Sequence, residues 1–115
     1  TDFAEANPEV VTGFLTAVAA GWKDAIADPE AAIASLIDRN PAADAALEQR
    51  RLQLAIDANV LTDAVTASGM GGVDAARMEA ALAQLGETYE FQNAPDASLY
   101  FTEAYLPSAD ARMLQ

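Results

Sequence analysis

Apolar residues along this chain recur mainly at three- and four-residue steps, the spacing that places them on one face of an α-helix. The clearest run lies between residues 8 and 27: Val11, Phe14, Leu15, Val18, Trp22, Ala25 and Ile26. Asn7 precedes Pro8, and Asn followed by Pro is a favoured start for a helix. The pattern therefore predicts a helix from Pro8 to about Ala27, with Trp22 as a core anchor rather than a ligand-stacking group.

A second helix is predicted from Pro29 to Asp38, because Asp28 and Pro29 repeat the same start signal. Its larger apolar residues fall on one side: Ile33, Leu36 and Ile37. A helix of this length is marginal by itself in water. We therefore expect it to pack against its neighbours.

A third helix is predicted from Pro41 or shortly after it, following a third signal at Asn40, to about Val65. Two adjacent apolar stripes follow it. One stripe holds Leu47, Leu54, Ala58, Leu61 and Val65, and the other holds Leu52, Ile56 and Val60. A surface helix of a small bundle needs a narrower face. We therefore expect this helix to contact two different layers.

The segment from Thr66 to Gly72 contains Gly69, Gly71 and Gly72, and it is predicted to be a flexible connection. Asp74 is then expected to cap a fourth helix from Ala75 to about Leu85, with Gly86 just past its end. The inward residues of this helix would be Met78, Ala81, Leu82 and Leu85.

Beyond the fourth helix, Asp96 is expected to cap a short helical piece that reaches Phe101. Pro107 should stop a further turn, and residues 108–115 are expected to be a loosely held tail after a helical domain at 1–107. Aromatic residues gather in this region: Tyr89, Phe91, Tyr100, Phe101 and Tyr105. They either fix the C-terminal segment to the rest of the chain or form an exposed patch.

The predicted fold class is all-α, with about four helices, a short C-terminal helical piece and almost no strand. Few segments alternate with period two, which is the pattern of a strand. Apolar residues make up 52% of the 115 residues, but many are Ala, so Leu, Ile, Val and the aromatic residues must supply the core. No run of about 18 apolar residues is apparent, and we expect no membrane span.

The formal net charge is −12, which disfavours binding to nucleic acid or to an anionic membrane surface. The acidic residues are dispersed singly and indicate a solvated surface. The chain has no Cys, so disulfides and thiolate metal sites are excluded. It opens with Thr1 rather than Met, and we expect it to be an excerpt of a longer protein.

Candidate chemistry is sparse because the chain has no His and only one Lys, Lys23. The four Ser residues lack a His to activate them: Ser35, Ser68, Ser98 and Ser108. Residues 69–72 lack the spacing of a phosphate loop, and Asp74 would repel an anion there. Asp57 and Asp63 should lie on different helix faces, and Asp38, Asn40 and Asp44 lack calcium-loop spacing. We assign no catalytic, cofactor-binding or metal-ligating residue, no cofactor and no enzymatic activity.

Several short motifs resemble, in order and spacing, one stretch of a family of periplasmic substrate-binding proteins. The family serves ABC importers of thiamine-precursor pyrimidines, with relatives for alkanesulfonates, taurine and nitrate. The motifs are Phe3-Ala4, Asn7-Pro8-Glu9-Val10-Val11, Phe14-Leu15, Gly21-Trp22, Asp28-Pro29-Glu30-Ala31-Ala32, Asn40-Pro41, Gly72-Val73-Asp74 and Phe101-Thr102-Glu103-Ala104-Tyr105-Leu106-Pro107. The resemblance runs from about Phe3 to Pro107.

The resemblance covers the last third of such a protein, which is mostly helical and packs against the first of two α/β lobes. It implies a periplasmic, bilobal parent that binds a small polar solute, best matched to a thiamine-precursor pyrimidine, and that docks on an ABC permease. Partners would be the missing N-terminal part, the permease and the solute, but not nucleic acid. The family's ligand contacts lie largely upstream, so no ligand-binding residue is placed here.

Two alternatives stay open. The first is that the chain is an autonomous helical protein-interaction module. The second is that it is part of a pyrimidine-synthesising enzyme whose His and Lys residues lie elsewhere. A homodimer of the chain is a further partner to consider, because an orphaned apolar face can be hidden by self-association.

Overall fold

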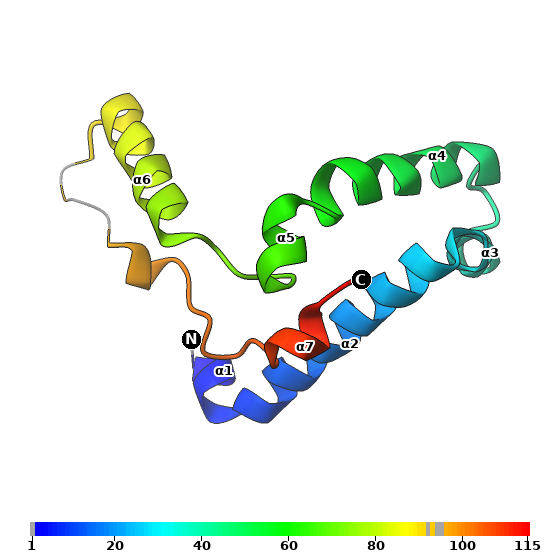
Figure 1. Cartoon of the computed structure of the whole chain (residues 1–115), viewed down its shortest axis with the longest axis horizontal. Helices are drawn as coiled ribbons and strands as arrows, with labels where there is room; N and C mark the ends of the chain where they lie inside the picture. The colour runs from blue at the N-terminus through cyan, green and yellow to red at the C-terminus, as the bar shows by residue number, and fades with distance from the viewer. Residues whose placement is uncertain (1, 92, 94–95) are drawn as a thin grey trace.

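The computed structural model describes residues 2–91, 93 and 96–115. Every regular element in these residues is helical, which confirms the all-α prediction. In chain order the elements are α1 (Asp2–Ala6), α2 (Pro8–Ala27), α3 (Pro29–Arg39), α4 (Ala45–Ala55), the π-helical η1 (Ile56–Val60), α5 (Asp63–Ser68), α6 (Ala75–Tyr89), the 3₁₀ turn η2 (Ala97–Leu99) and α7 (Ala109–Arg112). Figure 1 shows α2, α3 and α4 as a bent body from which α6 stands apart.

The first two predicted helices have the expected bounds in α2 and α3. The Asp28 carboxylate accepts a hydrogen bond from the Ala31 amide at 3.0 Å, as a helix cap does. Asn7 behaves differently, because its side-chain amide donates to the carbonyl of Phe3 at 2.9 Å. That bond joins α2 to α1, a helix that the sequence pattern did not predict.

The prediction of one long third helix is wrong. Asn40 ends α3, its amide donating to the Leu36 carbonyl at 2.8 Å, and Pro41 lies in a turn. Asp44 caps α4 instead, its carboxylate accepting from the Leu47 amide at 2.9 Å. An acidic cap placed after the proline thus takes the role that Asn40 was expected to have, since a carboxylate is an equally good acceptor for free amides.

The same predicted helix is interrupted again near its end. The Leu61 amide donates to the Ile56 carbonyl at 2.8 Å, a five-residue step that defines the π turn of η1. Thr62 then caps a separate helix, α5. Ile56 and Val60, which the sequence placed on one stripe, are buried at 3% and 9% exposure, whereas Leu54 of the other stripe stays exposed.

The fourth predicted helix begins at Asp74 as expected, with the Asp74 carboxylate 2.8 Å from the Arg77 amide. Its predicted end at Leu85 is wrong, because α6 continues to Tyr89 and Gly86 lies inside it. Glu90 ends the helix in the left-handed region, at φ 47°. A non-glycine residue therefore occupies the conformation that Gly86 was expected to supply.

The C-terminal residues do not form a loosely held tail. Residues 109–112 form α7, which packs on α2, and Leu114 is only 6% exposed. The Met70 amide donates to the Arg112 carbonyl at 2.9 Å, and the Arg112 guanidinium donates to the Met70 carbonyl at 3.0 Å. Because these two bonds tie the glycine-containing loop to α7, the loop is not the flexible connection that its composition indicated.

The buried core is small for a chain of this length. Its five members among the described residues come from four separate segments: Ala19, Ile33, Ile56, Val60 and Leu114. The radius of gyration is 17.4 Å, against about 13 Å for a compact chain of 115 residues. The accessible surface is 8364 Å², against roughly 6,000 Å² for a compact 12.0 kDa monomer. Much apolar surface is therefore left uncovered by the chain itself.

Candidate functional site

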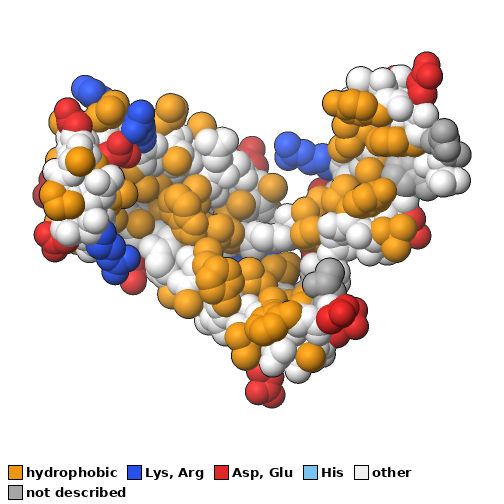
Figure 2. Space-filling view, turned by 180° about the vertical axis from the view of Figure 1, so that it is seen from behind, with side chains coloured by type: hydrophobic (Ala, Val, Ile, Leu, Met, Phe, Trp, Pro, Cys, Tyr) orange, Lys and Arg blue, Asp and Glu red, His pale blue; other side chains and the backbone are white. Residues whose placement is uncertain are grey.

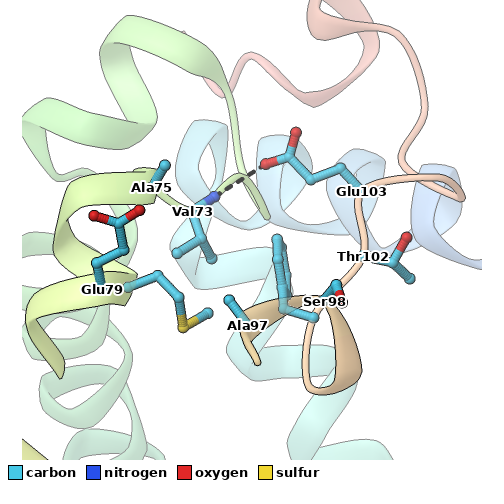
Figure 3. A pocket seen from close by; sticks show the side chains of 9 residues that line it. Val73, Ala75, Glu79, Ala97, Ser98, Thr102 and Glu103 are labelled. Carbon is cyan, nitrogen blue, oxygen red and sulfur yellow. Dashed lines mark hydrogen bonds between the residues drawn. The ribbon is translucent and has the colours of Figure 1, made fainter. Parts of the chain in front are cut away.

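An open hollow lies between α6 and the segment that follows η2, and we call it the α6 groove (Figure 3). It encloses about 500 Å³. Its apolar lining consists of Val73, Ala75, Met78, Ala97 and Phe101, and its polar lining of Glu79, Ser98, Thr102 and Glu103. This size and this mixture of an apolar floor with a few polar groups are typical of a binding site.

Hydrogen bonds fix the position of the two walls of the α6 groove. The Val73 amide donates to Oε1 of Glu103 at 3.2 Å, across thirty residues of sequence, as the dashed line in Figure 3 shows. The Asp96 carboxylate caps η2 by accepting from the hydroxyl of Ser98 at 2.8 Å and from its amide at 2.9 Å. Those two bonds, the hydroxyl first, lower the pKa of Asp96 below its ordinary value of 3.8.

The electrostatic character of the α6 groove is acidic. Glu79 and Glu103 line it, and no Lys or Arg does so among the described residues. A neighbouring hollow of about 820 Å³ shares Glu79 and Ala97 and adds Glu90 and Asp96. Carboxylates repel anions and attract cations, so the groove suits a positively charged or apolar occupant.

The described residues of the α6 groove offer apolar contacts and hydrogen-bonding groups to an occupant. The described residues contain no group of three or more His, Cys, Asp or Glu side chains able to hold a metal ion. The Ser98 hydroxyl is engaged with Asp96, and the chain has no His to activate it. Sequence reasoning missed Glu79 and Glu103 because nothing in their spacing shows that the chain returns to α6 after residue 96.

A second surface of interest is the outer face of α2, which we define as Val10, Gly13, Phe14, Ala17 and Gly21. All five residues are exposed, Phe14 at 66%, and space is open where Gly13 and Gly21 would carry a Cβ. Residues that are three or four positions apart share one side of a helix, so these residues form one row. Small residues in such a row allow another backbone to approach closely.

The opposite side of α2 packs within the chain. Leu15, Val18 and Ala19 line a small cavity of about 70 Å³ together with Leu106 and Pro107. The hydroxyl of Thr12 donates to the Tyr105 carbonyl at 3.0 Å. One side of α2 therefore already packs against the C-terminal segment, and the outer face of α2 is a separate apolar surface.

The helix α2 is also long and apolar enough to cross a membrane by length and composition, which the sequence pattern alone did not indicate. Core helices of soluble proteins meet the same criterion, but only 6% of the apolar window of α2 is buried here. Figure 2 shows hydrophobic side chains over much of the body that contains α2, α3 and α4, and also on the part that contains α6.

The aromatic residues divide between the two predicted roles. Tyr105 is half-buried, and its backbone carbonyl joins the C-terminal segment to Thr12 of α2. Tyr89, Phe91 and Tyr100 are exposed. The rings of Tyr89 and Phe91 stack with centroids 6.2 Å apart. Trp22 is half-buried, in keeping with a packing role.

The polar residues considered from the sequence are scattered over separate elements. Asp57 in η1 accepts from the Gln53 side chain at 2.8 Å, and Asp63 opens α5. Lys23 donates to the Asp110 carbonyl at 3.3 Å. Ser68 and Ser108 make hydrogen bonds within or at the start of their own helices. The structure does not assemble these residues into a site.

A family model described as NMT1/THI5 like matches residues 1–32. That stretch comprises α1, α2 and the start of α3, and so contains the outer face of α2 but not the α6 groove. No curated protein matches the chain, and no solved structure does either. The short match supports a relation to a substrate-binding-protein family in this part of the chain.

Proposed function

We propose that this chain is the helical C-terminal scaffold segment of an extracytoplasmic solute-binding protein that serves an ABC importer. The NMT1/THI5-like match at residues 1–32 supports the family relation. The observation that carries the proposal is the outer face of α2, which lies inside the matched residues and is left uncovered by the rest of the chain. A helix with both sides apolar is expected in the interior of a larger assembly.

The amount of uncovered surface fits this role. The chain exposes roughly 2,400 Å² more than a compact monomer of its mass, as the difference between 8364 Å² and about 6,000 Å² shows. Permanent interfaces bury roughly 2,000 to 5,000 Å² in total, about half of it on each partner. The excess on this one chain is therefore near the upper end of what a single partner loses to such an interface.

In the parent protein, the solute would bridge two lobes and favour the closed state by its greater affinity for that state. The chain described here would support one lobe, its α2 packed against the remainder of the protein. The proposed solute is a thiamine-precursor pyrimidine, the partners are the N-terminal part and the permease, and the location is the periplasm. The chain itself would carry no catalytic activity.

Calorimetry tests the scaffold role directly. The 115-residue chain alone is titrated with an aminopyrimidine, and the expected result is no saturable heat of binding, because the ligand contacts lie outside it. Analytical ultracentrifugation of the same sample should show self-association, since an uncovered apolar face tends to pair. Saturable binding at micromolar ligand contradicts the proposal, and so does a strictly monomeric chain at all concentrations.

An autonomous helical interaction module is the second candidate, and the α6 groove favours it, since a groove with defined walls is a binding feature within this chain. A monomer with one cooperative thermal transition would support it. Part of a pyrimidine-synthesising enzyme is a further candidate, which would require catalytic His and Lys residues outside this sequence.

A further inference from the structure

The α6 groove is independent of the outer face of α2, and it has features of its own. Its floor is apolar, and its walls come from α6 and from residues 97–103, which the bond between Val73 and Glu103 holds together. The neighbouring hollow continues along α6 as far as Gly86 and Glu90. Together the two hollows follow α6 for roughly 20 Å, the length of about four helical turns.

The charges along this path have one sign. Glu79 and Glu103 line the groove, Glu90 and Asp96 line its continuation, and no cation lines either among the described residues. The hydrogen bonds from Ser98 favour the ionised form of Asp96. An occupant with an apolar face and cationic flanks would cover the floor and neutralise the rim at the same time.

A second copy of this chain is a poor occupant. It carries 18 acidic residues against six Lys and Arg, so it would bring further negative charge to an acidic rim. An anionic surface or nucleic acid is disfavoured for the same reason. A basic polypeptide segment of a partner protein matches both the apolar floor and the acidic rim.

We infer that the α6 groove docks a basic amphipathic helix of a partner protein, with its apolar side on Met78 and Phe101 and its Lys or Arg side chains beside Glu79 and Glu103. Helix-in-groove recognition of this kind uses apolar anchors three and four residues apart. Rim charges set the rate and specificity of such docking more than its total affinity. The inference does not depend on the proposed transport role.

The test uses the full 115-residue chain and a synthetic peptide of about 15 residues with a Leu and Phe face flanked by Lys. A matched peptide has the same face flanked by Glu. Fluorescence anisotropy should show saturable binding of the Lys peptide only, weakened about tenfold or more when added salt screens the charges. Amide chemical shifts should change at residues 73–79 and 97–103.

Glu79→Gln should weaken binding of the Lys peptide several-fold, because one rim charge is lost while the bond between Val73 and Glu103 remains. Glu30→Gln on α3 removes the same charge away from the groove and should leave binding unchanged. Equal binding of the Glu peptide, equal effects of the two substitutions, or shifts confined to α2 would each overturn the inference. Groove shifts on dilution of the chain without peptide, a sign of pairing with a second copy, would also overturn it.

Discussion

At the scale of single residues, hydrogen-bonding chemistry decides where the helices begin. Asp28, Asp44 and Asp74 each accept a bond from an amide three residues later, at 2.8–3.0 Å. Asn7 instead donates to Phe3, because an amide side chain, unlike a carboxylate, can act as a donor. The caps at Asp28 and Asp74 could be predicted from residue type, but the cap at Asp44 was not, because the signal at Asn40 was expected to start that helix. The role of Asn7 depends on the helix before it.

Glu90 at the end of α6 gives the first prediction. Its backbone lies in the left-handed region, which costs a non-glycine residue about 1 kcal/mol. Glu90→Gly should therefore stabilise the chain by up to about 1 kcal/mol, measured as the free energy of unfolding in urea.

Glu87→Gly is the matched control, since Glu87 lies within α6. Glycine in a helix interior costs about 1 kcal/mol, so this variant should be less stable than the unmodified chain. A loss of stability in both variants would show that Glu90 is not held in the left-handed conformation.

The cap at Asp96 gives a prediction on pH. Its pKa is lowered in the fold, so its contribution to stability is present above pH 3.8 and is lost as pH falls through the lower folded value. The carboxyl carbon shift of Asp96 should therefore titrate below pH 3.8. Ser98→Ala removes the hydroxyl bond and should move that midpoint back toward 3.8, while an unchanged midpoint would show that the hydroxyl has no such effect.

At the scale of elements, the apolar period predicts α2 and α3 well, because each helix has one start signal and one principal buried side. It fails for the segment that contains α4, η1 and α5, where the π turn at Ile56 and a new cap at Thr62 interrupt one apolar run. It also fails for residues 66–72 and 108–115. Glycine content indicated flexibility in the first of these segments, and the place after Pro107 near the chain end indicated it in the second. The bonds between Met70 and Arg112 instead join the two segments.

The joined loop gives the prediction at this scale. Gly69 has φ 81°, and an added Cβ would lie 3.3 Å from backbone atoms of Arg112. Gly69→Ala should therefore destabilise the chain by at least about 1 kcal/mol, through strain and through separation of the loop from α7. Differential scanning calorimetry measures the change.

Gly86→Ala is its control, because Gly86 lies within α6 and nothing is within 4 Å of its added Cβ. This variant should be more stable by about 0.5–1 kcal/mol. A chain that tolerates both substitutions equally would contradict the docking of residues 69–72 against α7.

At the scale of the whole molecule, the main feature is incomplete burial. The core residues lie in α2, α3, η1 and the C-terminal segment, whereas α6 contacts chiefly the short η2. A helix of 15 residues with so few neighbours is marginal by itself in water. The open shape in Figure 1 follows from this small number of contacts between α6 and the rest of the chain.

Two adjacent residues on α2 distinguish surface from core. Phe14 is exposed on the outer face, and Leu15 lines the internal cavity beside Leu106 and Pro107. Phe14→Ser should reduce self-association of the chain, measured by sedimentation velocity, with little change in the melting temperature, because the side chain has no internal partner. Leu15→Ser should instead lower the unfolding free energy by about 2 kcal/mol or more.

Small-angle scattering of dilute Phe14→Ser should also give a radius of gyration near the 17.4 Å of the open shape. A value near 13 Å would indicate a compact chain and would contradict both the open structure and the scaffold proposal.

Local chemistry in the sequence determined the helical class, the bounds of α2 and α3, and the carboxylate caps, because these depend on residues within one or two turns. Only the tertiary structure decided the π turn in η1, the clasp of Met70 with Arg112 and the acidic walls of the α6 groove. Each of these joins residues that are distant in the chain or depends on which side of a helix finds a neighbour. The spacing of residues along the sequence does not reveal such contacts, because they form only when distant segments meet in the folded chain.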